Sequence, residues 1–252
     1  MSLFCALGID SPCQLRNQFT DAAHGRQIRV GGAEVPIPAR QAAIAAAVVA
    51  IAGLGVAGYA VMRPAPDMFA QCRVDGRPAP IGGPFTLTDE TGRKVTDRDV
   101  ITGPTLLYFG YTFCPDVCPM DNMRNALAVM ALEDSGRMVT PVFISVDSGR
   151  DTPETLRQFT DVMHPRMIGL TGTPEQVKAA SKAYRTFYQI RDPEDEYYLI
   201  DHSTQTYLVF PELGFVENFD RDVEAEDMAA RVACFVDAWT ASQAAKTAPA
   251  GQ

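Results

Sequence analysis

Two cysteines and a histidine are the residues of this sequence whose types and spacing predict a metal site. Cys114 and Cys118 lie four positions apart in the run YFGYTFCPDVCP (108–119), and His202 follows 84 positions later in the run DHST. Thiolates select Cu(I), zinc or iron–sulfur clusters, and imidazole binds copper and zinc. Three protein ligands fall short of the four that a structural zinc site takes. We therefore expect a small, open copper site from which the ion can be exchanged.

The sequence around the two cysteines suits a metal that is held and then released. Two thiolates hold Cu(I), and an imidazole completes a three-coordinate site that a ligand from another protein can enter. Pro119 fits the first helical position, which predicts Cys118 as the N-cap, where the helix dipole stabilises a thiolate. Pro115 and Pro119 also restrict the loop backbone. Two alternatives stay open: a C-x3-C pair can be a plain disulfide, and a lone histidine before a strand is often a hydrogen-bonded turn residue.

Other residues near this pattern have more than one interpretation. Met120 and Met123 could supply thioether ligands, but their helical spacing also fits core or surface packing. His164 precedes Pro165 and is expected to end a helix there. Four acidic residues shortly before His202 fit either a solvated loop or a surface that recognises a partner: Asp192, Glu194, Asp195 and Glu196.

Strand and helix signals alternate along residues 84–242. Helices are predicted to start after Thr152 and Thr173, because each is an N-cap type followed by proline and an acid. The other expected elements are a hairpin of 84–89 with 93–96, buried strands over 105–111 and 138–146, a helix over 119–134, a hairpin of 204–210 with 215–219, and a closing helix over 223–242. This order is typical of an α/β fold, with a central mixed sheet, helices on both faces and an N-terminal β-hairpin.

The predicted sheet brings the candidate ligands together. Cys114 follows the strand 105–111, and in such sheets ligands bind at the carboxyl ends of parallel strands. His202 directly precedes the strand 204–210, which begins at the same edge if it runs antiparallel. We therefore expect the cysteines and the histidine to meet across a groove.

The other four cysteines fall into two groups. Cys5 and Cys13 lie in the upstream segment and are interpreted as incidental. Cys72 and Cys234 could form a structural disulfide in an oxidising compartment. Two unrelated buried thiols are the alternative, which sequence alone does not exclude.

A run of 21 uncharged residues, 42–62, lies between Arg40 and Arg63. As a helix it is about 30 Å long, the thickness of a bilayer core. A cleaved signal peptide has a shorter apolar stretch, so we expect a single uncleaved transmembrane helix. Arginines are balanced on its two sides, and we favour the N-in orientation, with the large domain outside the cytoplasm. The expected organisation is a poorly ordered cytoplasmic segment (1–41), an anchor (42–62), a linker (63–83), a folded domain (84–242) and a disordered tail (243–252).

The two parts of the chain differ in charge. Residues 64–252 carry 17 Lys/Arg and 28 Asp/Glu, a net charge of −11, against +2 for residues 1–63. A domain this acidic does not bind nucleic acid through phosphate contacts. It could attract a basic surface on a protein partner or simply stay soluble.

Six blocks of the sequence match one known family in that family's order. They are IGGPFTLTDETG (81–92), YFGYTFCPDVCP (108–119), PVFISVDSGRDTPETLRQF (141–159), GLTGTPEQV (169–177), AYRTFY (183–188) and DEYYLIDHSTQTYLV (195–209). On these motifs the chain resembles the Sco/SenC family of membrane-anchored, thioredoxin-like copper proteins. The pairing of GYTxCPDxCP with a late DHS is highly specific, and the match covers most of residues 81–220.

The resemblance implies a thioredoxin-like three-layer sandwich in which Cys114, Cys118 and His202 bind one copper ion per chain, as Cu(I), Cu(II) or both. It implies a metallochaperone that delivers copper, directly or with other copper chaperones, to the binuclear copper centre of cytochrome c oxidase subunit II. Other copper chaperones and a thiol reductase are the further candidate partners. The implied location is the inner (cytoplasmic) membrane, with the C-terminal domain on the periplasmic side.

The competing function is enzymatic, a thiol–disulfide oxidoreductase that keeps the oxidase copper-site cysteines reduced. In it one motif cysteine attacks and the other resolves. Two features count against it as the main role: the spacing is C-x3-C where thioredoxins use C-x2-C, and Asp201-His202-Ser203 stands where thioredoxin-like oxidoreductases place a cis-proline. A redox purpose would also leave His202 with little to do. A peroxidase is weaker still, because nothing around Cys114 indicates a peroxide pocket.

Overall fold

The computed structural model describes residues 38–62, 67–73 and 81–247. The chain divides into two compact units, Met1–Pro64 and Ala65–Gln252. In the first unit, the helix α1 (Ala39–Met62) contains the run 42–62, and its described side chains are exposed. Among the described residues, no helix combines the length and the hydropathy of a membrane span. The transmembrane helix expected over 42–62 is thus not confirmed, and most of the expected 1–41 segment lies outside the described residues.

The second unit is built on a mixed sheet whose described strands number seven, in the order β2-β1-β5-β4-β3-β8-β9. The strands are β1 (Thr86–Asp89), β2 (Lys94–Thr96), β3 (Thr105–Gly110), β4 (Thr140–Ser145), β5 (Ile168–Thr171), β8 (Thr206–Phe210) and β9 (Gly214–Phe219). β3, β4 and β5 run parallel, whereas β8 pairs antiparallel with β3 and β1 pairs antiparallel with β5. The predicted mixed sheet and N-terminal hairpin are therefore confirmed.

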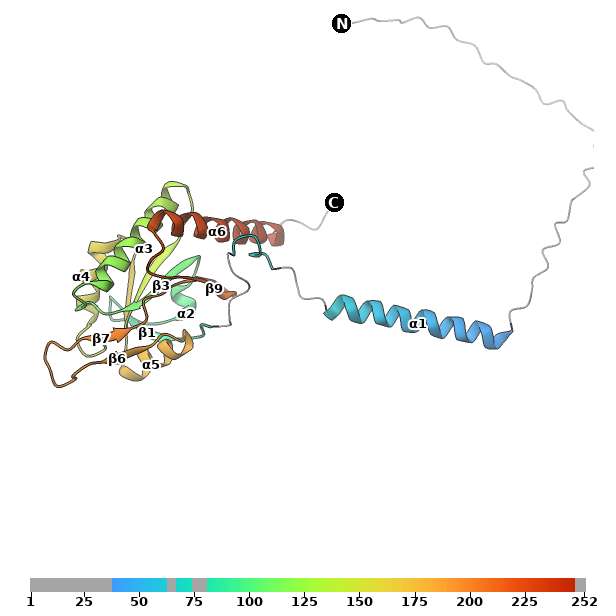
Figure 1. Ribbon diagram of the computed structural model, residues 1–252, viewed down its shortest axis with the longest axis horizontal. Coiled ribbons are helices and arrows are strands. Elements are labelled where there is room, and N and C mark those ends of the chain that lie inside the picture. The colour runs from blue at the N-terminus through green and yellow to red at the C-terminus, as the bar shows by residue number, and fades with distance from the viewer. Residues whose placement is uncertain (1–37, 63–66, 74–80, 248–252) are drawn as a thin grey trace, which may run out of the picture. The chain divides into compact units, whose positions relative to one another are not determined.

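Helices cover both faces of this sheet (Figure 1). They are α2 (Asp97–Val100), α3 (Val117–Asp134), α4 (Pro153–Met163), α5 (Pro174–Ala183) and α6 (Ala225–Thr247). On one face, Leu106 of β3 packs in a cluster with α3 and α6, and the ring of Phe143 in β4 lies tilted against that of Phe159 in α4, with 4.8 Å between the ring centres. On the other face, Phe109 of β3 contacts Tyr184, at the end of α5, at 5.6 Å. Successive side chains of β3 thus point to opposite faces of the sheet and pack into a core on each face. The fold therefore has three layers, with the sheet between two layers of helices.

The predicted starts of α4 and α5 are confirmed by their caps. The Thr152 hydroxyl accepts a hydrogen bond from the Thr155 amide at 3.2 Å, and Thr173 forms a reciprocal capping box with Gln176. Each cap satisfies amides that the first turn of a helix leaves without partners. The caps therefore set where α4 begins after β4 and where α5 begins after β5.

Three stretches differ from expectation. Residues 67–73, expected in the linker, contain the buried Phe69, whose ring lies 5.4 Å from that of Phe210 and 5.2 Å from that of Phe235. The closing helix α6 continues through Thr247, so residues 243–247 are helical rather than a disordered tail, because alanine-rich sequence favours helix. A two-stranded sheet of β6 (Tyr188–Ile190) and β7 (Ile200–His202) was not predicted.

Candidate metal centre

The three predicted ligands meet at one edge of the central sheet. Cys114 lies in the loop after β3, Cys118 in the first turn of α3, and His202 is the last residue of β7. Their donor atoms all lie within 4.8 Å of one another, and Cys118 Sγ is 3.2 Å from His202 Nε2. The groove inferred from strand directions therefore brings the two thiols and the imidazole together as expected. Within the described residues, this cluster offers three donor side chains to a metal.

The start of α3 differs from the prediction. The helix begins at Val117, with Asp116 as its N-cap, so Cys118 lies inside the first turn and is not the N-cap. The Asp116 side chain makes no capping hydrogen bond. Instead, the Cys118 amide donates to the sulfur of Cys114 at 3.4 Å. The sulfur that the helix N-terminus stabilises is therefore that of Cys114.

In the metal-free protein the pKa values of the two thiols are shifted in opposite directions. A hydrogen bond from the Cys118 thiol, with further ones from backbone amides, lowers the pKa of Cys114 to about 3 against the cost of its partial burial. The same interaction with Cys114, added to its own complete burial, raises the pKa of Cys118. Cys114 is thus a half-buried thiolate, and Cys118 is a buried thiol.

The imidazole of His202 is held in one orientation. Its Nδ1 lies 2.8 Å from the carbonyl oxygen of Ser203, an acceptor, so Nδ1 carries the proton and Nε2 faces the sulfurs with its lone pair. Ser203 is itself fixed to Phe187, whose amide donates to its hydroxyl and whose carbonyl accepts from its amide. The rings of Tyr108 and Tyr111 meet the imidazole edge-on at 6.1 and 5.8 Å.

Gly110, the last residue of β3, leaves room for the buried sulfur. A Cβ atom at this position would lie 2.9 Å from Cys118 Sγ and 2.9 Å from the ring of Tyr108. Real Cβ contacts are essentially never this short, so no other residue fits without movement. Sequence reasoning missed this role, although a glycine at the end of a buried strand is the kind of signal that could have identified it.

Asp151 supports the loop that carries Cys114 and was also missed. Its buried carboxylate accepts from the Thr112 amide at 2.9 Å, the Thr112 hydroxyl at 2.6 Å and the Ser145 hydroxyl at 2.5 Å. Burial raises the pKa of Asp151, against the lowering effect of these hydrogen bonds. The aspartate follows β4, whose carboxyl end lies at the same sheet edge as that of β3, and this position was the available signal.

Comparison with known proteins agrees with this geometry. The family model described as SCO1/SenC matches residues 74–237. The chain belongs to the SCO1/SenC family. Protein SenC of Rhodobacter capsulatus is 55% identical over 205 residues, which are 80% of this chain and 93% of that protein. The mitochondrial SCO1 homolog of Homo sapiens is 38% identical over 161 residues, which are 63% of this chain and 53% of that protein.

Solved Sco structures share the fold. The ScoI structure of Arabidopsis thaliana with copper bound is 40% identical, with a TM-score of 0.58, and covers 62% of this chain and 98% of its own. That of Bradyrhizobium japonicum ScoI with copper bound is 37% identical, with a TM-score of 0.56, and covers 61% and 98%. The thioredoxin-like fold that the resemblance implied is thus confirmed for this SCO1/SenC chain.

The remaining candidate residues lie outside the metal centre of this SCO1/SenC protein. Met120 and Met123 are exposed on α3. His164 caps the end of α4, as predicted, and its Nδ1 accepts from the Arg166 amide at 3.1 Å. The four acidic residues are exposed between β6 and β7: Asp192, Glu194, Asp195 and Glu196. Tyr198 of the same loop donates to Asp147 at 2.7 Å, which fixes the loop beside the centre.

Cys72 and Cys234 are joined away from the metal centre. Their sulfurs are 2.02 Å apart, and the bond links positions separated by 162 residues. They lie in the cluster that α3 and α6 form with Phe69, on one face of the sheet. Among the cysteines that the structure describes, Cys114 and Cys118 are free, so the pair available to a metal there is the one in the motif.

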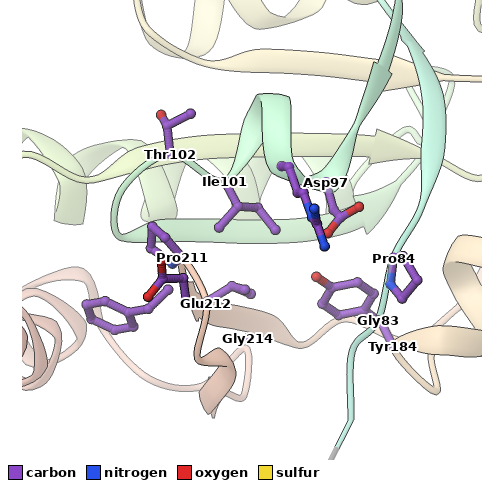
Figure 2. A pocket seen from close by; sticks show the side chains of 12 residues that line it. Gly83, Pro84, Asp97, Ile101, Thr102, Tyr184, Pro211, Glu212 and Gly214 are labelled. Atoms are coloured by element: carbon purple, nitrogen blue, oxygen red, sulfur yellow. The ribbon is translucent and has the colours of Figure 1, made fainter.

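A cavity of about 790 Å³ lies at the far end of β8 (Figure 2). β8 runs from Thr206, near the metal centre, to Phe210 at this cavity. The described lining residues come from the segment before β1, from α2 and its end, from Tyr184 and from the β8–β9 turn, and they include no cysteine or histidine. The cavity is therefore separate from the candidate ligands.

Proposed function

We propose that this SCO1/SenC chain is a copper carrier in which Cys114, Cys118 and His202 hold one copper ion. The observation that carries the proposal is the meeting of two sulfurs and one imidazole nitrogen within 4.8 Å. Thiolate and imidazole are the ligands that copper takes in proteins, and three donors leave room for a ligand from outside. The copper-bound ScoI structures of two relatives support the same ion.

The protonation of the site favours uptake of Cu(I). The thiolate of Cys114 is already formed and half-buried, so it can meet the ion first. The ion then displaces the proton of Cys118, since a metal-bound thiol is deprotonated. The lone pair of His202 Nε2 needs no rearrangement, because the hydrogen bond from Nδ1 to Ser203 already sets the ring.

The destination we propose is the binuclear copper centre of cytochrome c oxidase subunit II, reached directly or through another copper chaperone. Ligands of the acceptor would replace Cys114 first and the buried Cys118 later, in a series of three-coordinate exchanges. Support comes from membership of the SCO1/SenC family and from the accessible side of the centre at Cys114. The acidic residues between β6 and β7 give the same side a negative rim that suits a basic contact surface.

The test is metal stoichiometry on the full chain with Cys5 and Cys13 changed to serine, reduced, loaded with copper and freed of loose ions. One tightly held copper per parent chain is expected, with clear weakening in His202→Ala. Equal copper retention by the parent and by His202→Ala would refute the three-ligand site. His164→Ala is the matched control, because this second histidine lies outside the cluster.

We also propose that residues 42–62 attach the protein to the inner membrane, with the second unit on the periplasmic side. The support is the uncharged sequence of this run, its helical conformation in α1 and the exposure of its described side chains. The full chain should remain with membranes after alkaline washing, and residues 65–252 should be released. Release of both would overturn the attachment.

A second candidate function is thiol–disulfide exchange with the oxidase copper-site cysteines. The observation in its favour is the pairing of an accessible thiolate, Cys114, with a buried thiol, Cys118, whose amide donates to it. Such a pair can attack through Cys114 and resolve through Cys118. Reduction of a disulfide substrate by His202→Ala at the parent rate would favour this function if neither chain retained copper.

A further inference from the structure

Two exposed methionines on α3 have no role in the metal centre or in the core. Met120 is 59% exposed and Met123 is 43% exposed. Complete burial of a side chain of this size stabilises a fold by about 1.5–3 kcal/mol, and because Met120 and Met123 stay partly in solvent they contribute much less than this. The structure thus excludes the core-packing interpretation that their spacing allowed.

Both methionines line one groove between α3 and the start of α6. The groove has a volume of about 540 Å³, and Glu224 and Glu226 also line it. Two thioethers and two carboxylates therefore face a common, solvent-accessible space. A thioether sulfur is a soft donor that selects Cu(I), whereas the carboxylates attract any cation.

The positive charges around the groove do not cancel this attraction. Arg124 also lines it, but its guanidinium donates to the carbonyl of Asp220 and to the hydroxyl of Thr206, both at 2.9 Å. Arg124 keeps its one positive charge and the N-terminus of α6 adds about half of one, which together are less than the two full negative charges of Glu224 and Glu226. A cation such as Cu(I) is therefore accepted there.

The spacing of the two sulfurs fits one ion. Residues three apart on a helix have Cβ atoms about 5–6 Å apart, and the flexible methionine side chain lets both sulfurs turn to one point. Met120 follows Cys118 by two positions, about 3 Å along the helix axis, while Cys118 itself is buried. A site in the groove would therefore be close to the metal centre and separate from it.

We propose that Met120 and Met123 form a second, weaker Cu(I) site, at which an ion rests before it enters the metal centre or after it leaves. The role as a waiting position rests on the proposed copper-carrying function. The binding itself does not, because it uses neither cysteine nor histidine. Two thioethers hold Cu(I) less firmly than two thiolates, which suits an ion that must move on.

The test compares Cu(I) binding by full-length chains in which Cys5 and Cys13 are serine, titrated without oxygen against a chromophoric Cu(I) chelator. The parent should bind one Cu(I) tightly and a second weakly. Met120→Leu with Met123→Leu should weaken the second binding by about tenfold or more and leave the first unchanged. Leucine keeps the volume and apolar character, so the fold and any apolar docking surface persist.

Met130→Leu is the matched control. Met130 is 50% exposed on the same helix but does not line the groove, and its substitution should change neither binding event. A direct readout is the methyl signal of [methyl-13C]methionine: two signals, lost in the double variant, should shift as the second Cu(I) binds.

Each failure has its own signature. A parent that binds one Cu(I) only, or a double variant that keeps the second Cu(I), would overturn the methionine site. A parent that lacks tight binding but loses a weak Cu(I) in the double variant would overturn the copper centre and uphold the methionine site.

Discussion

The second unit contains two cysteine pairs that use the same side chain differently. Cys72 and Cys234 are far apart in sequence, and they form a disulfide between a short packed segment and α6. Cys114 and Cys118 are four positions apart at the edge of the sheet, and both are free. The first pair is surrounded by apolar side chains, whereas the second has an imidazole and a helix N-terminus beside it. These surroundings assign one pair to stability and the other to chemistry.

Removing one sulfur of the motif should give the largest effect. Cys114→Ser or Cys118→Ser leaves a single thiolate and an imidazole, so tightly held copper should disappear completely from elemental analysis. For the half-buried Cys114, the free energy of unfolding should change by less than about 1 kcal/mol. Full copper retention by either variant would contradict the assignment of this pair to metal binding.

Removing the disulfide should give the opposite result. Cys72→Ser with Cys234→Ser releases a closed loop of more than 160 residues, and the free energy of unfolding should fall by about 2–5 kcal/mol. Urea unfolding of the oxidised parent and of the double variant measures the loss. Copper stoichiometry should stay at the parent value, and a variant that folds but loses copper would break the separation between the pairs.

Gly110→Ala should affect both stability and metal binding. The new methyl group would meet Cys118 Sγ at 2.9 Å, so the strand or the sulfur must move, at a cost of about 1–3 kcal/mol. Copper should be held more weakly, because the displaced sulfur leaves its partners. Gly103→Ala is the control, since an added Cβ there meets nothing within 4 Å. Equal behaviour of the two variants would contradict the packing argument.

The pH dependence of alkylation should separate the motif thiols from each other. With a pKa of about 3, Cys114 is already ionised at pH 5, so its rate with iodoacetamide should be nearly constant from about pH 5 to 8. An ordinary thiol would react about tenfold faster per pH unit over this range. Cys118→Ala removes the main hydrogen bond to Cys114, and a rising profile should appear. A parent profile that rises in the same way would contradict the thiolate at Cys114.

The sequence predicted the order of the main elements and the meeting of the ligands, because both follow from local patterns. Strand 105–111 is mostly apolar. An antiparallel direction for 204–210, which was a condition of the prediction and which the structure confirms, places His202 beside the carboxyl end of that strand. The caps at Thr152 and Thr173 were equally local and equally reliable.

The features that sequence analysis missed depend on contacts between residues far apart in the sequence. The N-cap of α3 was predicted at Cys118 and lies at Asp116, because proline is tolerated at any position of the first helical turn and Pro119 therefore does not fix the start. The hydrogen bond from the Cys118 amide to the sulfur of Cys114 depends on the folded loop, which the local sequence does not show. The β6–β7 pair has short strands with an exposed loop and no strong alternation. The support of Thr112 by Asp151 joins positions 39 apart, which no local pattern reveals.

His202 lies in the hairpin of β6 and β7, which is a separate sheet from the one that leads to the two cysteines. The imidazole belongs to this small sheet, whereas the two sulfurs belong to the loop after β3 and to α3. An ion bound to all three groups would tie the hairpin to the rest of the domain, and loading would make its local opening less frequent by mass action. A partner that binds the hairpin could then sense whether the protein carries its cargo without touching the metal.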